Sequence, residues 1–424
     1  MTRDYLDEVE AQLVARVQRG DHNRRPRGRR ELVAVLPALL ATAVVVAVVL
    51  SVAGGSPRHA RTGHAATRGT RTEAPATVTT PPTVTTPPTA AGSSTTVQST
   101  TPVLATSPSG PVPVGFTPDS FTAIGELTWW LLGTAPCSSA PCTSIVRTDD
   151  GGRTFVGIPA PGTDQVSELR FADAENGFAY GPELWVTHDA GATWNQVSVP
   201  GSVRELAIGS GYAYAIVRSG STGELLRAAT WSDSWTELPL AGDAYGGLWV
   251  NGKDVMLESS TTSGSAMQLL VSPDDGATFS ARALPPSIAC NFDGALPAIW
   301  ADCATGTLSG VWRSQDSGAT WVAAGGDATR SGEPGEPNSA AFAAASPVVA
   351  VYGYQQLYRT ADGGATWSQV PTPAGITWWQ YLGFTDATHG VALGYAGTEK
   401  PANERLYYTT DAGATYHPVT IAGS

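Results

Sequence analysis

The chain has 424 residues and carries 25 Lys and Arg against 37 Asp and Glu, a net charge of −12. Residues 113–424 hold only 13 basic side chains against 30 acidic ones, a net of −17. A domain this acidic repels a phosphate backbone, so the composition excludes charge-driven binding of nucleic acid.

The N-terminal segment has the pattern of a short tail and a membrane anchor. Residues 1–31 predict a cytoplasmic tail with a short amphipathic helix, whose apolar face is formed by Leu6, Val9, Leu13 and Val17. Residues 32–53 form an uncharged run of 22 residues, long enough for a transmembrane helix. A cleaved secretory signal is the alternative, but the length and late start of the run favour an anchor.

Arginines set the expected orientation of this anchor. Seven precede it closely: Arg16, Arg19, Arg24, Arg25, Arg27, Arg29 and Arg30. Those that follow are fewer and more widely spread: Arg58, Arg61, Arg68 and Arg71. The positive-inside rule therefore predicts a single-pass protein of the cell membrane, with a cytoplasmic N-terminus and an extracellular C-terminal domain.

Residues 54–112 predict a disordered stalk. The segment is rich in Ser, Thr, Pro, Ala and Gly, as in "TVTTPPTVTTPPTAAGSSTTVQSTTP" (77–102). Such a composition buries no core, prefers extended conformations and is open to O-glycosylation.

Residues 113–424 contain a repeated motif of Ser or Thr, any residue, Asp, any residue, Gly, any residue, Thr and an aromatic residue. Six copies span 148–155, 187–194, 272–279, 314–321, 360–367 and 409–416, with Asp150, Asp189, Asp274, Asp316, Asp362 and Asp411 at the acidic position. A seventh, degenerate copy in 230–240 keeps Asp233 and Trp235. The closing aromatic residues lie 39 to 49 residues apart, a period typical of propeller blades.

Each repeat reads as four short strands. In the second repeat these are "VSELRFAD" (166–173), "NGFAYG" (176–181), "ELWVTHD" (183–189) and "ATWNQVSVP" (192–200). Short apolar runs broken by Gly, Pro, Asn and Asp are strand and turn signals. The sequence therefore predicts an all-β, seven-bladed β-propeller, with the Asp motif between the third and fourth strands of a blade.

The repeated aspartate is interpreted as a turn residue. Its carboxylate can accept hydrogen bonds from N–H groups of its own turn, and the following Gly allows the backbone conformation. Calcium ligation is the alternative, but the spaced third ligand and the distal Glu of an EF-hand loop are missing. No metal, cofactor or catalytic residue is therefore predicted.

The motif resembles the Asp-box, or BNR repeat, of sialidases, sortilin-type receptors, xyloglucanases and Ycf48-type photosystem II assembly factors. This resemblance covers residues 113–424 and implies a β-propeller whose boxes lie away from any active site. Seven boxed blades in one chain match the Ycf48 type best in architecture.

Besides an assembly factor of the Ycf48 type, for which no partner-binding motif is found, two functions remain open at this point. The first is a non-catalytic binding or scaffold module for a protein or a glycan. The second is a glycoside hydrolase of the sialidase type, although the Arg-Ile-Pro motif of that family is absent and no set of Arg, Tyr and Glu can be assembled. Paired carboxylates elsewhere could still form a hydrolase site, because such pairing is spatial.

Chain order predicts which face of the propeller binds. The Asp turns share one face with the turns between first and second strands, and the other connections lie on the opposite face. Four aromatic residues near that opposite face are the predicted ligand contacts: Tyr245, Tyr354, Trp378 and Trp379. Trp129 and Trp130, neighbours in one strand, are expected in the core on either side of it.

The cysteines predict two disulfides on the same opposite face. These are Cys137–Cys142 and Cys290–Cys303, a pairing indicated by even number and close spacing. Disulfides fit an oxidising, extracytoplasmic location, and the spacing does not suit zinc.

Overall fold

The computed structural model describes residues 109–261, 266–286, 290–304, 308–326, 341–396 and 404–421. The predicted tail, the predicted transmembrane segment 32–53 and the predicted stalk up to residue 108 lie outside these ranges. Within the described ranges, no helix has the length and apolarity needed to cross a membrane.

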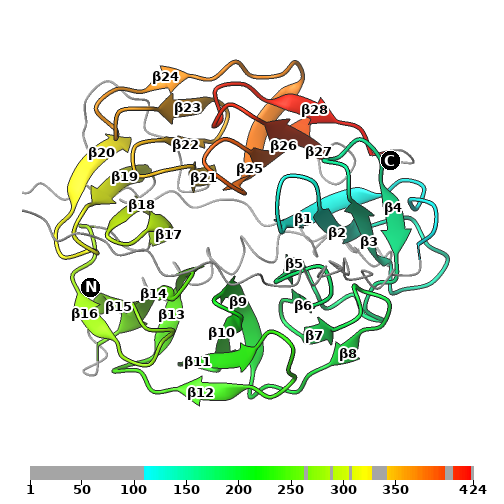
Figure 1. Cartoon of the computed structure of the whole chain (residues 1–424), viewed down its shortest axis with the longest axis horizontal. Coiled ribbons are helices and arrows are strands. Elements are labelled where there is room, and N and C mark those ends of the chain that lie inside the picture. The colour runs from blue at the N-terminus through cyan, green and yellow to red at the C-terminus, as the bar shows by residue number, and fades with distance from the viewer. Residues whose placement is uncertain are drawn as a thin grey trace, which may run out of the picture. The chain divides into compact units, whose positions relative to one another are not determined.

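The described residues form seven four-stranded antiparallel sheets arranged as a ring, which confirms the predicted seven-bladed propeller (Figure 1). Blades 1 to 3 contain β1 (Thr117–Ala123), β2 (Trp129–Thr134), β3 (Thr143–Thr148), β4 (Val156–Ile158); β5 (Glu168–Phe171), β6 (Gly177–Tyr180), β7 (Leu184–Thr187), β8 (Asn195–Gln196); and β9 (Ser202–Gly209), β10 (Tyr212–Ser219), β11 (Thr222–Ala229), β12 (Thr236–Leu238). Blades 4 and 5 contain β13 (Ala244–Asn251), β14 (Asp254–Ser260), β15 (Met267–Ser272), β16 (Ser280–Arg282); and β17 (Cys290–Ala295), β18 (Ala298–Ala304), β19 (Ser309–Ser314), β20 (Val322–Gly326). Blades 6 and 7 contain β21 (Ala341–Ala344), β22 (Ala350–Gly353), β23 (Leu357–Thr360), β24 (Ser368–Gln369); and β25 (Ile376–Phe384), β26 (Gly390–Ala396), β27 (Glu404–Thr409), β28 (His417–Val419).

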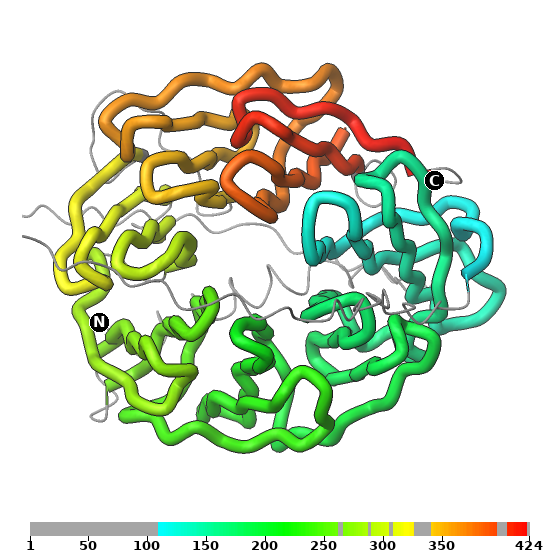
Figure 2. The backbone as a smooth tube through the Cα atoms, in the orientation of Figure 1, coloured from blue at the N-terminus to red at the C-terminus, as the bar shows by residue number. Residues whose placement is uncertain are grey.

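The first strand of each blade lies nearest the centre of the ring, and the fourth lies outside (Figures 1 and 2). Because the four strands alternate in direction, the Asp turns share one face with the turns between first and second strands. We call this the Asp-turn face. The remaining connections lie on the opposite face.

The core lies between adjacent blades, as Trp129 and Trp130 in β2 illustrate. Trp129 is 5 % exposed and packs edge-on against Phe121, in an apolar cluster that also contains side chains of blade 7. Trp130 is fully buried on the other side, with its ring 4.0 Å from that of Phe171 in blade 2. The prediction that these neighbours face opposite sides of the strand is confirmed.

Side-chain packing closes the ring, because blade 1 and blade 7 share no strand. One apolar cluster joins them across this seam and includes Leu131, Val146, Val391, Leu393, Leu406 and Ile421. Beside the seam, Gly110 and Gly157 of β4 exchange two backbone hydrogen bonds of 2.8 and 2.9 Å. The end of the predicted stalk, residues 109–112, is therefore ordered against blade 1.

Both predicted disulfides are present. Cys137 and Cys142 lie in the connection between β2 and β3, with Cα atoms 5.6 Å apart. Cys290 in β17 lies directly opposite Cys303 in β18, and their Cα atoms are 4.0 Å apart. Both bonds lie at the opposite face, as chain order required.

Candidate functional site

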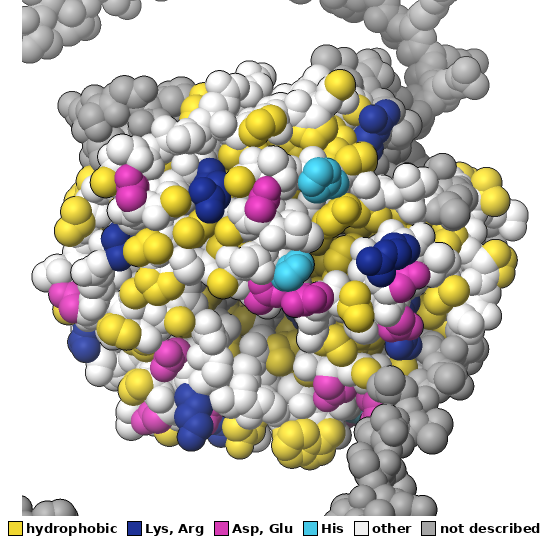
Figure 3. Space-filling model, turned by 45° about the horizontal axis from the view of Figure 1, so that its top comes forward, with side chains coloured by type: hydrophobic (Ala, Val, Ile, Leu, Met, Phe, Trp, Pro, Cys, Tyr) yellow, Lys and Arg dark blue, Asp and Glu magenta, His cyan; other side chains and the backbone are white. Residues whose placement is uncertain are grey.

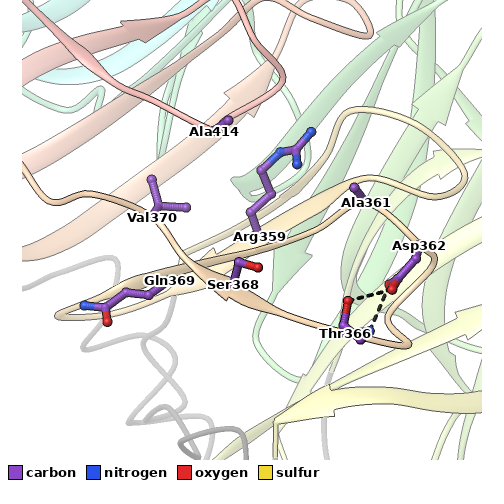
Figure 4. A pocket seen from close by; sticks show the side chains of 8 residues that line it. All are labelled: Arg359, Ala361, Asp362, Thr366, Ser368, Gln369, Val370 and Ala414. Carbon is purple, nitrogen blue, oxygen red and sulfur yellow. Dashed lines mark hydrogen bonds between the residues drawn. The ribbon is translucent and has the colours of Figure 1, made fainter.

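The Asp turns use their carboxylates internally. In blade 6, Oδ1 of Asp362 accepts hydrogen bonds from Thr360 Oγ1 at 2.8 Å and from the backbone N–H of Thr366 at 2.9 Å. Oδ2 accepts a bond of 2.6 Å from Thr366 Oγ1 (Figure 4). These bonds, led by that from the Thr366 hydroxyl, lower the pKa of Asp362 to about 2.

The same three bonds recur in all six boxes. The hydroxyl two residues before each aspartate donates to it, and the N–H and hydroxyl of the Thr four residues after it do likewise. The glycine is needed too: Gly364 has φ of +87°, and a Cβ there would lie 2.6 Å from Ala324. These carboxylates are occupied in holding turns.

Three of the closing aromatic residues are tryptophans that attach their blade to the preceding one. Trp194, Trp321 and Trp367 donate their indole N–H groups to backbone oxygens of the preceding blade at 3.0, 3.0 and 2.7 Å. The degenerate copy in blade 3 behaves differently, because Asp233 bonds the side chain of His188 at 3.0 Å instead of its own turn.

The cavity beside the blade 6 box is lined by charged side chains that are already engaged in hydrogen bonds within the fold. Its volume is about 240 Å³, and it is lined by Arg359, Ala361, Asp362, Thr366, Ser368, Gln369, Val370 and Ala414 (Figure 4). Arg359 donates from Nε to the carbonyl of Ala412 in blade 7 at 2.8 Å. The charged groups in this cavity therefore hold turns and join blades.

A group of possible metal ligands lies on the Asp-turn face. Single donor atoms of Glu126, Asp386 and His389 lie within 4.8 Å of one another. His389 Nδ1 is 2.8 Å from Asp386 and 3.5 Å from Glu126, which belongs to blade 1. Figure 3 shows histidine beside acidic side chains near a central hollow of one face. Asp386 already accepts hydrogen bonds from the backbone N–H groups of Thr388 and His389, and it is hydrogen-bonded to the His389 ring.

Two predicted ligand residues come together on the opposite face. The rings of Tyr354 and Trp378, both half-buried, stack at 5.7 Å, and Trp378 also stacks on Tyr395 at 3.9 Å. The prediction for Trp379 is wrong, because that side chain is 1 % exposed and packs edge-on against Tyr407 in the core. Neighbouring residues of a strand point to opposite sides, so only one of this pair can face outward.

Tyr245, the remaining predicted ligand residue, lies apart from this stack in blade 4. It is half-buried, and the guanidinium of Arg218 in blade 3 lies 5.4 Å from the centre of its ring. The structure therefore places the predicted aromatic residues in two separate groups on the opposite face.

Sequence reasoning missed the bulges in the inner strands. The register shifts at Asp119 in β1, Arg204 in β9, Tyr245 in β13, and Thr377 and Gln380 in β25, and once more between Gly246 and Trp249 in β13. Bulges redirect side chains and are frequent beside functional sites. Asp119, Arg204, Tyr245 and Thr377 lie in the half of the strand that begins at the opposite face, and the other two shifts lie near the middle of their strands. No local sequence pattern marks them, since a bulge depends on the register with the partner strand.

Sequence reasoning also missed three acids, one buried and two half-buried, that join the blades. Glu205 accepts the backbone N–H groups of Gly247 and Leu248 in the next blade at 3.1 and 2.6 Å. Glu258 accepts that of Cys290 at 2.7 Å, and Asp293 that of Ala344 at 2.8 Å. Burial raises the pKa of all three carboxyls, to about 8 for Glu258. These acids satisfy N–H groups that an inner edge strand leaves unpaired.

Solved structures resemble this chain at low sequence identity. A Mycobacterium tuberculosis puromycin-hydrolyzing peptidase superposes with a TM-score of 0.52 at 12 % identity, over 74 % of this chain and 57 % of that one. Ycf48 bound to a D1 peptide superposes with a TM-score of 0.48 at 20 % identity, over 72 % of this chain and 96 % of that one. Ycf48 from Cyanidioschyzon merolae superposes with a TM-score of 0.49 at 18 % identity, over 72 % of this chain and 98 % of that one.

No protein-family model matches the chain, and no curated protein matches it in sequence. The resemblance to Asp-box repeat proteins therefore rests on the motif, and the likeness to the peptidase shows a similar fold alone.

Proposed function

We propose that this chain is a membrane-anchored, extracytoplasmic propeller that acts as a non-catalytic binding or scaffold module. Its partner is a protein or a glycan, which it binds through the opposite face. Residues 32–53 supply the anchor, and the two disulfides suit an oxidising compartment.

One observation carries this proposal. Inner strands of blades 1, 3, 4 and 7 each depart from regular pairing in the half that begins at the opposite face. A bulge leaves one residue unpaired and disrupts the hydrogen-bond ladder locally, which a regular strand avoids. Four such departures near one face support a recognition surface there.

The polar groups elsewhere support a scaffold rather than a catalyst. The aspartates of the six boxes hold turns, and Glu205, Glu258 and Asp293 hold neighbouring blades together. A catalytic acid or base must reach a substrate proton, and these carboxylates already accept hydrogen bonds from the fold.

The test is a pull-down with the full chain from extracts of its own cells, run beside a panel of fluorogenic glycosides. Trp378→Ala should weaken capture of the partner, because it removes a ring from the opposite face. Trp231→Ala is the matched control, since Trp231 is 68 % exposed on the Asp-turn face. Equal loss with both variants, or glycoside turnover abolished by a single carboxylate substitution, would contradict the proposal.

A further inference from the structure

Arg204 in β9 differs from the other arginines of the described part. Each of those contacts an acceptor or an aromatic ring, as with Arg147, Arg153, Arg170, Arg218, Arg227, Arg282, Arg313, Arg359 and Arg405. Arg204 is half-buried, and its Nε atom is buried without a partner, as are those of Arg282 and Arg313. Arg282 and Arg313 donate through Nη1 instead, whereas the guanidinium of Arg204 bonds to no described residue. A buried donor left unpaired is costly, so such a group calls for an explanation.

The bulge fixes the direction in which Arg204 points. Glu205 pairs with Ile216 and Val203 pairs with Val217, so Arg204 is the extra residue between them. In a bulge, two residues oppose one residue of the partner strand. Arg204 thus shares the side of Glu205, which bonds to the N–H groups of Gly247 and Leu248. That side faces blade 4.

A second arginine projects from the same side of blade 3. Arg218 lies two residues after Ile216 in β10, and alternate residues of a strand share a side. Its guanidinium lies over the ring of Tyr245 in blade 4. Arg204, Arg218 and Tyr245 therefore lie between blades 3 and 4 toward the opposite face, and two of them are bulge residues.

The surrounding charge narrows the class of ligand. Residues 113–424 carry a net charge of −17, so the overall field repels polyanions such as nucleic acids and sulfated glycans. An anion held here must be a single group on an otherwise neutral or basic ligand. The planar fork of a guanidinium matches a carboxylate, which it can bind through two parallel hydrogen bonds.

We propose that Arg204, with Arg218 beside Tyr245, binds one carboxylate of a protein partner, contributed by an Asp or Glu side chain or by the chain terminus. This inference rests on the proposed binding function and names its chemistry. A protein is favoured over a sugar acid because Tyr245, the aromatic ring at this site, is already in contact with Arg218. The stack of Trp378 with Tyr354 and Tyr395 lies apart from it, in blades 6 and 7. A sugar would need a free ring face.

The direct test is arginine modification by phenylglyoxal in the full chain, read out by peptide mass spectrometry. Acetyl-Gly-Ala-Ala offers a terminal carboxylate, acetyl-Ala-Asp-Ala-amide a side-chain carboxylate, and acetyl-Gly-Ala-Ala-amide none. We expect one or both carboxylate peptides to slow modification of Arg204 by about fivefold or more, as a charge-assisted hydrogen bond allows. Arg153, on the Asp-turn face, reports non-specific protection.

Three results would overturn this site. They are no slowing at Arg204, equal slowing by the uncharged amide, and equal slowing at Arg153. Protection by glucuronate but by neither peptide would also overturn the choice of a protein and indicate a sugar acid.

Variants separate this inference from the general binding function. Arg204→Gln should weaken capture of the partner about tenfold, the scale of one lost charge-assisted bond. Arg204→Lys keeps the positive charge but loses the planar guanidinium. It should bind the partner more tightly than Arg204→Gln and less tightly than the wild type. Arg153→Gln, with the same change in net charge, should have no effect. A partner that binds wild type and Arg204→Gln equally would remove the carboxylate site while leaving the binding module intact.

Discussion

Asp362 and Glu258 show how the fold gives two carboxyls opposite properties. Asp362 is exposed, and hydrogen bonds led by that from the Thr366 hydroxyl lower its pKa to about 2. Glu258 is 2 % exposed, and burial raises its pKa to about 8, although the N–H of Cys290 opposes the shift. One carboxyl stabilises its turn as an anion, while the other is favoured in its neutral form.

Glu258 should make stability fall as pH rises. The folded pKa of about 8 lies above the ordinary value of 4.5, so between these values the folded state binds more protons than the unfolded state. Unfolding free energy must then decrease across that window. Glu258→Gln keeps an oxygen for the Cys290 N–H and should flatten this dependence in denaturant unfolding from pH 5 to pH 8. An unchanged slope would show that Glu258 stays ionised.

At the scale of elements, the blades are joined by repeated local devices. Trp367 follows the blade 6 box, donates its indole N–H to Ala324 in β20 and packs edge-on against Tyr352 at 5.7 Å. Gly325 makes room for this indole, since a Cβ there would lie 2.7 Å from its Nε1. The box therefore positions a tryptophan that attaches its blade to the preceding one.

Trp367→Phe separates this hydrogen bond from the packing of the ring. The Phe variant should lose roughly 1 kcal/mol of unfolding free energy, the scale of one hydrogen bond. Trp367→Ala should lose more, about 2–3 kcal/mol, below the range for a fully buried ring because Trp367 is half-buried. Equal losses for the two variants in chemical denaturation would assign the whole effect to the hydrogen bond, and no loss for Trp367→Phe would assign it to packing.

The Cys290–Cys303 bond should stabilise the β17–β18 hairpin. In the chain-entropy model, a crosslink across a sequence separation of 13 residues destabilises the unfolded state by about 3 kcal/mol, because it restricts the conformations of the chain. Replacing both cysteines by Ser should lower the melting temperature more than the same change at Cys137 and Cys142, whose separation is 5 residues. The reverse order would indicate that strain outweighs chain entropy.

At the scale of the molecule, the seam between blade 1 and blade 7 is the one junction of the ring without a direct chain connection. Elsewhere a polypeptide link joins each blade to the next, so a weakened interface reforms easily. At the seam, apolar packing that includes Leu393 holds blade 1 and blade 7 together. Local opening should therefore begin there.

Leu393→Ala and Leu357→Ala compare the seam with an ordinary interface. Both side chains are nearly fully buried, at 2 % and 1 % exposure, so each variant should lose about 2–5 kcal/mol. Only Leu393→Ala should speed hydrogen exchange in both β1 and β27, because these strands lie on the two sides of the seam. Faster exchange confined to the mutated blade would contradict an opening seam.

The sequence by itself determined the number of blades, the four strands in each, the place of the Asp turns, both disulfides and the face on which they lie. These features follow from local signals that recur along the chain: alternation, turn residues and one motif at a regular period. Trp129 and Trp130 were predicted correctly for the same reason, since strand alternation is a local rule.

Only the tertiary structure decided which side chains are available for binding. It placed Trp379 in the core, made Arg204 a bulge residue, and matched Glu205, Glu258 and Asp293 to N–H groups of the following blade. The residues that decide each of these outcomes lie in separate strands or in separate blades. Register and inter-blade packing bring them together, and neither leaves a local pattern in the sequence.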